Sequence, residues 1–141
     1  MSLDRAVAAL GLGLATALGA GIVAGAVGRS EAASVVEIRI HFSRYEPAAI
    51  SVPAGQPVTF VITNTDPIDH EWIVGDDDVH RRHRTGTEPA HGARPTEISV
   101  RALTERRTTV TFDRPGKLTF VCHLPGHEAY GMVGTLTVTS D

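Results

Sequence analysis

A short run near the carboxyl end of the chain carries three side chains that can ligate a soft metal ion. Cys122 is the only cysteine, His127 follows it after four intervening residues, and Met132 follows His127 after four more. A thiolate, an imidazole and a thioether on one loop make up most of the donor set of a mononuclear blue copper site. Such a site adds a second histidine, so that His₂Cys forms a trigonal plane with a weak axial methionine. The spacing therefore predicts a copper site that still needs one histidine from elsewhere.

His70 is the best candidate for that histidine. It follows the β-branched run at residues 57–63 and a polar turn at residues 64–69, and it begins another short apolar stretch. A residue at the end of a core strand can meet a distant loop at one pole of a β-sandwich. We therefore expect His70 to be buried and to complete the copper site. Zinc suits the set less well, because structural zinc sites prefer several thiolates or paired Cys and His ligands.

The rest of the chain predicts the strands that must position these residues. Extended stretches bounded by turn residues occur at residues 35–42, 45–52, 57–63, 70–74, 97–100, 108–112, 118–122 and 132–138. Seven or eight short strands within about a hundred residues predict an all-β Greek-key sandwich. Trp72 is the only tryptophan, and we expect it to pack in the core of that sandwich.

These motifs together resemble the cupredoxin family, which includes plastocyanin and azurin. Cys-x4-His-x4-Met followed by Gly134-x-x-x-Val138 resembles the ligand loop and last strand of the family, and the likeness covers residues 34–140. It implies one copper ion that cycles between Cu(I) and Cu(II), held by His70, Cys122, His127 and Met132. It also implies that Asn64 hydrogen-bonds to the ligand loop and pins Cys122. The edge of His127 is then the expected port for electrons.

The first 33 residues differ in composition from the rest of the chain. Residues 6–27 carry no charge, and Arg5 and Arg29 flank them. This pattern is typical of a secretory signal peptide or of an uncleaved amino-terminal membrane anchor. Both alternatives place the expected copper-binding domain, residues 34–141, in the periplasm or another extracytoplasmic space. A lone cysteine in an exported protein cannot form an internal disulfide, and copper ligation gives it another role.

Residues 75–95 interrupt the strand pattern with a polar segment. Asp76, Asp77 and Asp78 can cap a short helix that runs through Arg84. Because the segment is too polar for a core, we expect it to be solvated. Five histidines are left over from the copper site, and we expect them to be spare: His41, His80, His83, His91 and His123. We expect His123 to point away from Cys122, at the surface or next to the site, and only one copper ion to bind tightly.

Charge and motifs narrow the function. A net charge of −3 without a basic stripe excludes nucleic-acid binding. The leading hypothesis is an exported, monomeric blue copper protein that is not an enzyme and carries single electrons between redox partners. The alternative is an extracytoplasmic copper-binding protein that delivers the ion to an acceptor. A copper reductase or oxidase subunit is the third hypothesis. The trinuclear cluster of multicopper oxidases, which share the Cys-x4-His-x4-Met spacing, needs His-x-His pairs that this sequence lacks.

Overall fold

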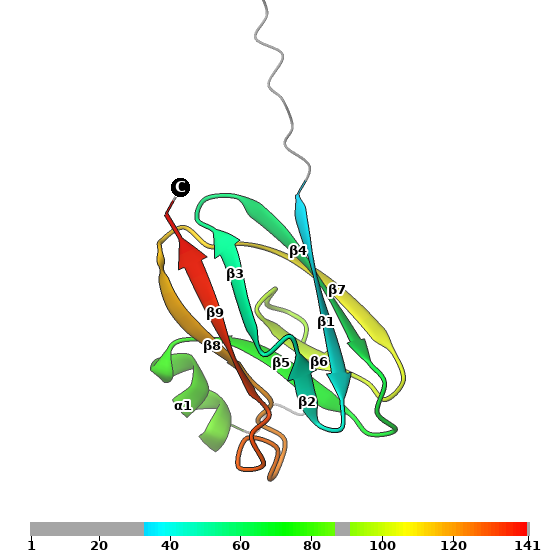
Figure 1. Cartoon of the computed structure of the whole chain (residues 1–141). Coiled ribbons are helices and arrows are strands. Elements are labelled where there is room, and N and C mark those ends of the chain that lie inside the picture. Colours follow the sequence, from blue (N-terminus) through cyan, green and yellow to red (C-terminus); the bar gives the residue numbers. More distant parts are fainter. Residues whose placement is uncertain (1–32, 87–90, 141) are drawn as a thin grey trace, which may run out of the picture. The chain divides into compact units, whose positions relative to one another are not determined.

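The computed structural model describes residues 33–86 and 91–140 of the chain. In this region two sheets face each other as a β-sandwich (Figure 1). One sheet has the strand order β2-β1-β4-β7, and the other has the order β3-β9-β8-β5-β6. The elements are β1 (Ser34–His41), β2 (Arg44–Glu46), β3 (Ala49–Pro53), β4 (Pro57–Asn64), β5 (His70–Gly75), α1 (Asp77–Thr85), β6 (Glu97–Val100), β7 (Glu105–Thr111), β8 (Gly116–Val121) and β9 (Val133–Thr139). The expected all-β sandwich is confirmed.

The predicted signal peptide or anchor, residues 1–33, lies outside the described residues except for its last position. In residues 33–86 and 91–140, no helix has the length and hydrophobicity needed to cross a membrane. The described chain enters the sandwich directly as β1, which runs parallel to β4.

The described residues form nine strands where seven or eight were predicted, because one predicted strand is divided between the sheets. Residues 45–52 were expected to form one extended stretch. Tyr45 instead pairs with Ile40 of β1, whereas Ala49 pairs with Thr135 of β9. The chain changes sheet at Pro47, which has no N–H with which to continue a ladder. This change places β2 at the edge of one sheet and β3 at the edge of the other.

The inner faces of the two sheets bury an apolar core. Along β3, buried and exposed residues alternate, as expected for a strand with one face on the core. Trp72 is fully buried, and its ring centroid lies 4.8 Å from that of Phe60, so its predicted role in core packing is confirmed. Gly134 of β9 leaves room for the ring of Phe120, because a Cβ at residue 134 would lie 2.1 Å from that ring. The core therefore needs glycine at this position.

Helix α1 packs against β5, on the side that faces away from the other sheet (Figure 1). Asp76 caps it as predicted, because its Oδ1 accepts hydrogen bonds from the backbone N–H groups of Asp78 and Val79. The expectation that residues 75–95 are solvated was wrong for the histidines of this segment. His80 is 2% exposed, and the side chains of His83 and His91 are each 5% exposed. For His80 and His83 the reason is amphipathicity, because α1 turns these histidines to the sheet and its arginines to water. His91 lies outside the helix, and its Nε2 is 3.4 Å from the buried carboxylate of Glu71.

Candidate metal centre

Strand register brings the four predicted ligands to one end of the sandwich. His70 is the first residue of β5, and Cys122 follows the last residue of β8. Because β5 and β8 are antiparallel neighbours, these two ends meet. Met132 immediately precedes β9, which pairs with β8, and its carbonyl oxygen accepts a 3.2 Å hydrogen bond from the amide of Cys122. His127 lies on the loop between β8 and β9, so the loop and β5 converge at this pole.

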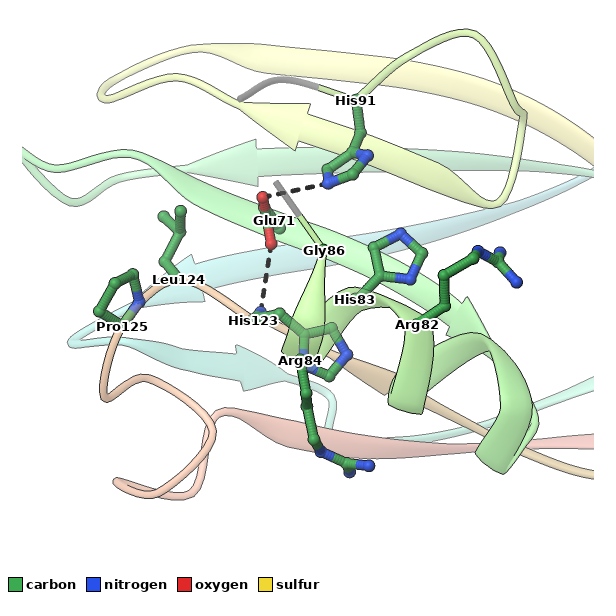
Figure 2. Close-up of a pocket in the computed structure, with 9 residues that line it drawn as sticks. All are labelled: Glu71, Arg82, His83, Arg84, Gly86, His91, His123, Leu124 and Pro125. Atoms are coloured by element: carbon green, nitrogen blue, oxygen red, sulfur yellow. Dashed lines mark hydrogen bonds and ion pairs between the residues drawn. The ribbon is translucent and has the colours of Figure 1, made fainter. Parts of the chain in front are cut away.

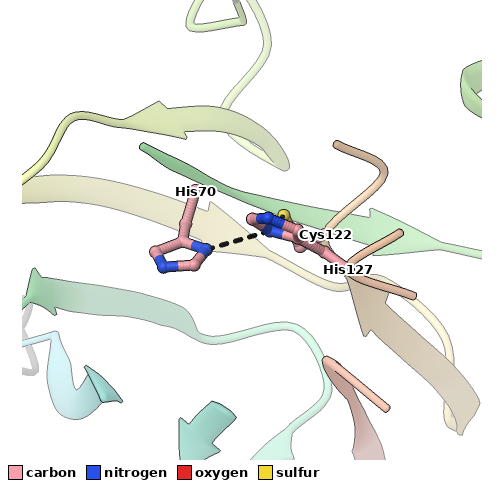
Figure 3. Close-up of side chains that lie close together, drawn as sticks. All are labelled: His70, Cys122 and His127. Atoms are coloured by element: carbon pink, nitrogen blue, oxygen red, sulfur yellow. Dashed lines mark hydrogen bonds between the residues drawn. The ribbon is translucent and has the colours of Figure 1, made fainter. Parts of the chain in front are cut away.

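Three of the predicted ligands present donor atoms to a common point (Figure 3). The ligand atoms of His70, Cys122 and His127 lie within 4.8 Å of one another. The Nδ1 of His127 is 3.2 Å from the Sγ of Cys122 and 3.2 Å from the Nδ1 of His70. His70, Cys122 and Met132 are fully buried, whereas His127 is partly exposed. One thiol and two imidazole nitrogens this close together fit the donor preference of copper.

Asp66 fixes the orientation of His70. Its Oδ2 lies 2.9 Å from the Nε2 of His70, and a carboxylate only accepts hydrogen bonds. The Nε2 therefore carries the proton, and the Nδ1 keeps its lone pair toward the other predicted ligands. The backbone N–H groups of Phe42 and Ser43 each donate to the same carboxylate at 2.8 Å. Burial raises the pKa of Asp66, but these two amides and His70 outweigh it and hold the pKa below its ordinary value.

The pKa shifts of Cys122 and His127 have opposite directions, so the free thiol keeps its proton whereas the imidazole is neutral. Burial raises the pKa of the Cys122 thiol to about 11, although backbone N–H groups of Leu124 and Glu71 point at the sulfur and act against that rise. The Glu71 amide donates to Sγ at 3.3 Å. Metal binding must therefore release the thiol proton. Burial and the neighbouring His70 lower the pKa of His127, so its ring is neutral at pH 7 and offers a lone pair.

Backbone hydrogen bonds hold the ligand loop, residues 122–132, in a tight fold. The amide of His127 donates to the carbonyl of Leu124 at 3.0 Å, and the amide of Met132 donates to the carbonyl of His127 at 2.9 Å. Gly126 and Gly131 have φ angles of 87° and 89°, which residues with a Cβ rarely adopt. The loop thus fixes the position of His127 between the two residues that border the strands.

Asn64 does not make the contact that the family resemblance implied. Its side-chain nitrogen donates at 2.8, 3.2 and 3.1 Å to the carbonyl oxygens of Ile68, Val100 and Arg101. Its Oδ1 accepts a 2.9 Å hydrogen bond from the amide of Asp66. Among the hydrogen bonds of the described residues, none joins the Asn64 side chain to the ligand loop. Asn64 instead shapes the turn that carries Asp66 into contact with His70, and it is Glu71 that bonds the sulfur of Cys122.

Comparison with known proteins decides the family. The model of the copper-binding proteins of the plastocyanin/azurin family matches residues 32–139. The chain belongs to this family. As a cupredoxin it takes one copper ion as its cofactor, and the donor set at the pole of the sandwich is chemically suited to that ion.

Two bacterial relatives of this cupredoxin carry the name copper-resistant cuproprotein CopI. The protein from Pseudomonas aeruginosa is 28% identical over 141 residues, which cover 77% of this chain and 78% of the relative. The protein from Rubrivivax gelatinosus is 32% identical over 98 residues, which cover 67% of this chain and 59% of the relative. The match therefore spans somewhat more than half the length of the second relative.

Solved structures of auracyanins share the fold of this cupredoxin. Auracyanin B superposes with a TM-score of 0.64 at 27% identity, and the match covers 76% of this chain and 89% of auracyanin B. The dithionite-reduced auracyanin of Roseiflexus castenholzii has a TM-score of 0.63 at 26% identity, with 77% and 99% coverage.

Sequence reasoning missed two carboxylates that border this centre. Asp66 lies in a polar turn, where an acidic residue is ordinary, and only the fold shows that it reaches His70. Glu71 had a detectable signal, because it is an acidic residue inside the apolar stretch at residues 70–74 and is 6% exposed in the structure. A buried carboxylate requires partners, so its position already pointed to polar groups on the outer side of β5.

Proposed function

We propose that this cupredoxin is an exported single-electron carrier whose copper is held by His70, Cys122, His127 and Met132. The sulfur of Cys122 and the Nδ1 atoms of the two histidines are the near donors, and Met132 contributes the thioether next to them. Copper held there supplies one-electron chemistry between Cu(I) and Cu(II). The chain itself supplies the donor geometry, the exclusion of water and a contact surface.

The observation that carries this proposal is the preassembly of the donors. Three donor atoms already lie within 4.8 Å of one another, on strands and on a loop held by backbone hydrogen bonds. Asp66 additionally fixes which nitrogen of His70 is available. A site that is held rigidly changes little when its charge changes, so the cost of reorganisation in each electron transfer is small.

The surface around His127 suits a protein partner. His127 is the one proposed ligand with solvent exposure. Exposed apolar side chains lie on the segments next to it: Tyr130 is on the ligand loop, and Phe42 and Leu103 are on loops whose amides bond Asp66. Exposed apolar groups that gather at one site mark contact surfaces. We propose that a redox partner docks here and exchanges electrons through the edge of His127.

Copper delivery is the second candidate function. The names of the two relatives, copper-resistant cuproprotein CopI, favour a role in copper handling. Burial argues against rapid release, because His70, Cys122 and Met132 are fully buried and the ion must pass the ligand loop to leave. Export to an extracytoplasmic compartment fits both functions and rests on the amino-terminal sequence pattern.

Voltammetry and ion transfer on the same preparation distinguish the two functions. We expect reversible one-electron voltammetry of the copper-loaded protein and slow loss of Cu(I) to a chelating acceptor. The matched variant is Gly126→Ala, because a Cβ at this φ of 87° strains the loop without removing a ligand. Faster loss of Cu(I) from this variant than from wild type is expected. Irreversible voltammetry together with rapid Cu(I) loss from the wild type would instead establish delivery.

A further inference from the structure

A second group of histidines lies on the outer side of the sheet, away from the copper ligands. Helix α1 contributes His80 and His83, the segment before β6 contributes His91, and the residue after Cys122 is His123. We call these four residues the outer histidine cluster. Figure 2 shows three of them around a pocket, with Glu71 between His91 and His123. The sequence predicted that these residues are spare, but ring contacts join all four on the outer side of the sheet.

Two members of the outer histidine cluster form a possible ligand set with a carboxylate. The ligand atoms of His83, His91 and Glu97 all lie within 4.8 Å of one another. The Nε2 of His83 is 3.4 Å from the Oε2 of Glu97, and the ring centroids of His83 and His91 are 4.9 Å apart. All three side chains are more than nine-tenths buried. Two imidazoles and a carboxylate converge here from a helix, a loop and a strand.

A hydrogen bond of His83 shows which of its ring nitrogens faces Glu97. Its Nδ1 lies 2.8 Å from the carbonyl oxygen of Val79, which can only accept, so the Nδ1 carries the proton. The other nitrogen, Nε2, faces the carboxylate of Glu97, which has only lone pairs to offer. Two groups in this arrangement are joined by a positive centre, which is either a proton on Nε2 or a metal ion bound by both. Histidine ligands of metals show this pattern, with one nitrogen on the ion and the other N–H on a carbonyl.

The other two histidines of the cluster are already engaged and are not candidate ligands. The Nε2 of His80 lies 3.2 and 3.3 Å from the carbonyl oxygens of Gly75 and Thr119, and its Nδ1 lies 2.9 Å from the Nε2 of His123. His123 packs its ring on that of His83, with centroids 5.7 Å apart and an interplanar angle of 19°. His80 and His123 therefore pack beside the site and do not act as ligands. The ligand set is limited to His83, His91 and Glu97, and His83 and His91 also line the pocket.

The charged side chains around His83, His91 and Glu97 affect the charge of the ion that can bind there. Arg82 and Arg94 contact the carboxylate of Glu97 at 3.0 and 3.1 Å. Both side chains are more than half exposed, so an ion that binds Glu97 would displace them toward water. Glu71 supplies a second buried carboxylate, with its Oε1 3.4 Å from the Nε2 of His91. With both arginines displaced from Glu97, the two carboxylates would match the charge of a divalent ion. Imidazole and carboxylate donors together suit Zn²⁺ and Cu²⁺, and a three-ligand set leaves a position for water.

We propose that His83, His91 and Glu97 form a second metal site, which takes a divalent ion of the Zn²⁺ or Cu²⁺ kind independently of the copper centre. The two sites meet at Glu71. The backbone N–H of this residue bonds the sulfur of Cys122 at 3.3 Å, and its carboxylate accepts from the amide of His123 at 3.2 Å. Contacts from an ion in the second site would therefore run through His91 and Glu71 to the sulfur of Cys122.

Zinc retention by the copper-loaded full chain tests this proposal. Zn²⁺ is the probe because copper binds more tightly than zinc at a given donor set, so zinc does not displace it. After dialysis against Zn²⁺ and then against a weak chelator, wild type is expected to retain one zinc beside one copper. The double variant His83→Ala/His91→Ala and the isosteric variant Glu97→Gln are expected to lose the zinc and keep the copper. The control His41→Ala changes a histidine that lies outside both ligand sets and outside the outer histidine cluster, and it is expected to retain both ions.

Copper content and visible absorption show whether each variant remains folded around its copper centre. A Glu97→Gln protein with unchanged copper and no zinc supports the second site even if the double variant does not fold. Repeating the dialysis with Cu²⁺ then shows which ion the site holds more tightly. A wild-type chain that retains no metal beyond the first copper would overturn the proposal. Equal zinc retention by wild type, Glu97→Gln and the double variant would do the same, because the zinc would then lie elsewhere.

Discussion

Replacement of Asp66 by asparagine tests the architecture of the centre most sharply. The carboxylate of Asp66 accepts three hydrogen bonds, from the amides of Phe42 and Ser43 and from the Nε2 of His70. Asparagine offers one oxygen in place of two. If that oxygen takes the position of Oδ2, it serves Ser43 and His70, and the amide nitrogen then faces the N–H of Phe42. At least one buried donor is left without an acceptor, and the remaining bonds lose their charge.

These losses set the expected size of the effect. An unpaired buried donor costs about 1–3 kcal/mol, and a hydrogen bond to a neutral acceptor is weaker by about 1 kcal/mol than one to a charged acceptor. We therefore expect Asp66→Asn to lower the free energy of unfolding of the metal-free protein by about 2–4 kcal/mol. Because the tautomer of His70 is no longer fixed by a charge, copper affinity should also fall about 10–100-fold.

Urea denaturation at several pH values measures the first effect, and a copper competition titration measures the second. The folded pKa of Asp66 is lowered, so its contribution is fully present above the unfolded pKa of about 3.9 and is lost as the pH falls through the folded pKa. The difference between wild type and variant should be constant above pH ~5 and shrink below pH ~4. Asp113→Asn, at an exposed position, is the matched control and should change stability by less than about 0.5 kcal/mol. An Asp66→Asn protein as stable as this control would refute the reasoning.

Three further predictions follow from the centre and the core. Met132→Gln should keep copper bound and lower the reduction potential, since a stronger axial donor stabilises Cu(II); an unchanged potential would show that Met132 is not a ligand. Because burial raises the pKa of the Cys122 thiol to about 11, the apparent copper affinity should rise up to about tenfold per pH unit between pH 6 and 8. Competition titrations measure this slope, and a flat profile would mean that no proton is released. Gly134→Ala should destabilise the protein by about 1–3 kcal/mol or more, because the added Cβ meets the ring of Phe120. The exposed Ser51→Ala on the neighbouring strand is its control in urea denaturation, and equal stability of the two variants would contradict the packing argument.

The sequence predicted those parts of the fold that depend on local patterns. Alternating apolar residues identified the strands, and Asp76 identified the start of α1, because both signals act within a few residues. The division of residues 45–52 between two sheets was missed. Each half alternates correctly by itself, and the sheet to which each half belongs is decided only by its partners, β1 and β9.

Prediction of the metal centre from sequence was limited in the same way, because only contacts within one short segment could be predicted. The ordered Cys122, His127 and Met132 lie on one loop, so their spacing alone predicted that they act together. Asp66 reaches His70 through a turn whose shape depends on Asn64 and on carbonyl groups of a distant segment. The outer histidine cluster joins a helix, a loop and the end of β8, and no spacing rule connects residues so far apart in the chain. Contacts of this kind become visible only when the sheets are assembled.

The absorption spectrum of the protein loaded with Cu(II) tests the central claim most directly. Our account predicts one intense thiolate-to-copper band in the visible region, which Cys122→Ala abolishes and which the second-site variant Glu97→Gln leaves unchanged. A weak spectrum typical of nitrogen and oxygen ligands would contradict it. So would an intense band that survives in Cys122→Ala, because Cys122 is the only thiol that the chain contains.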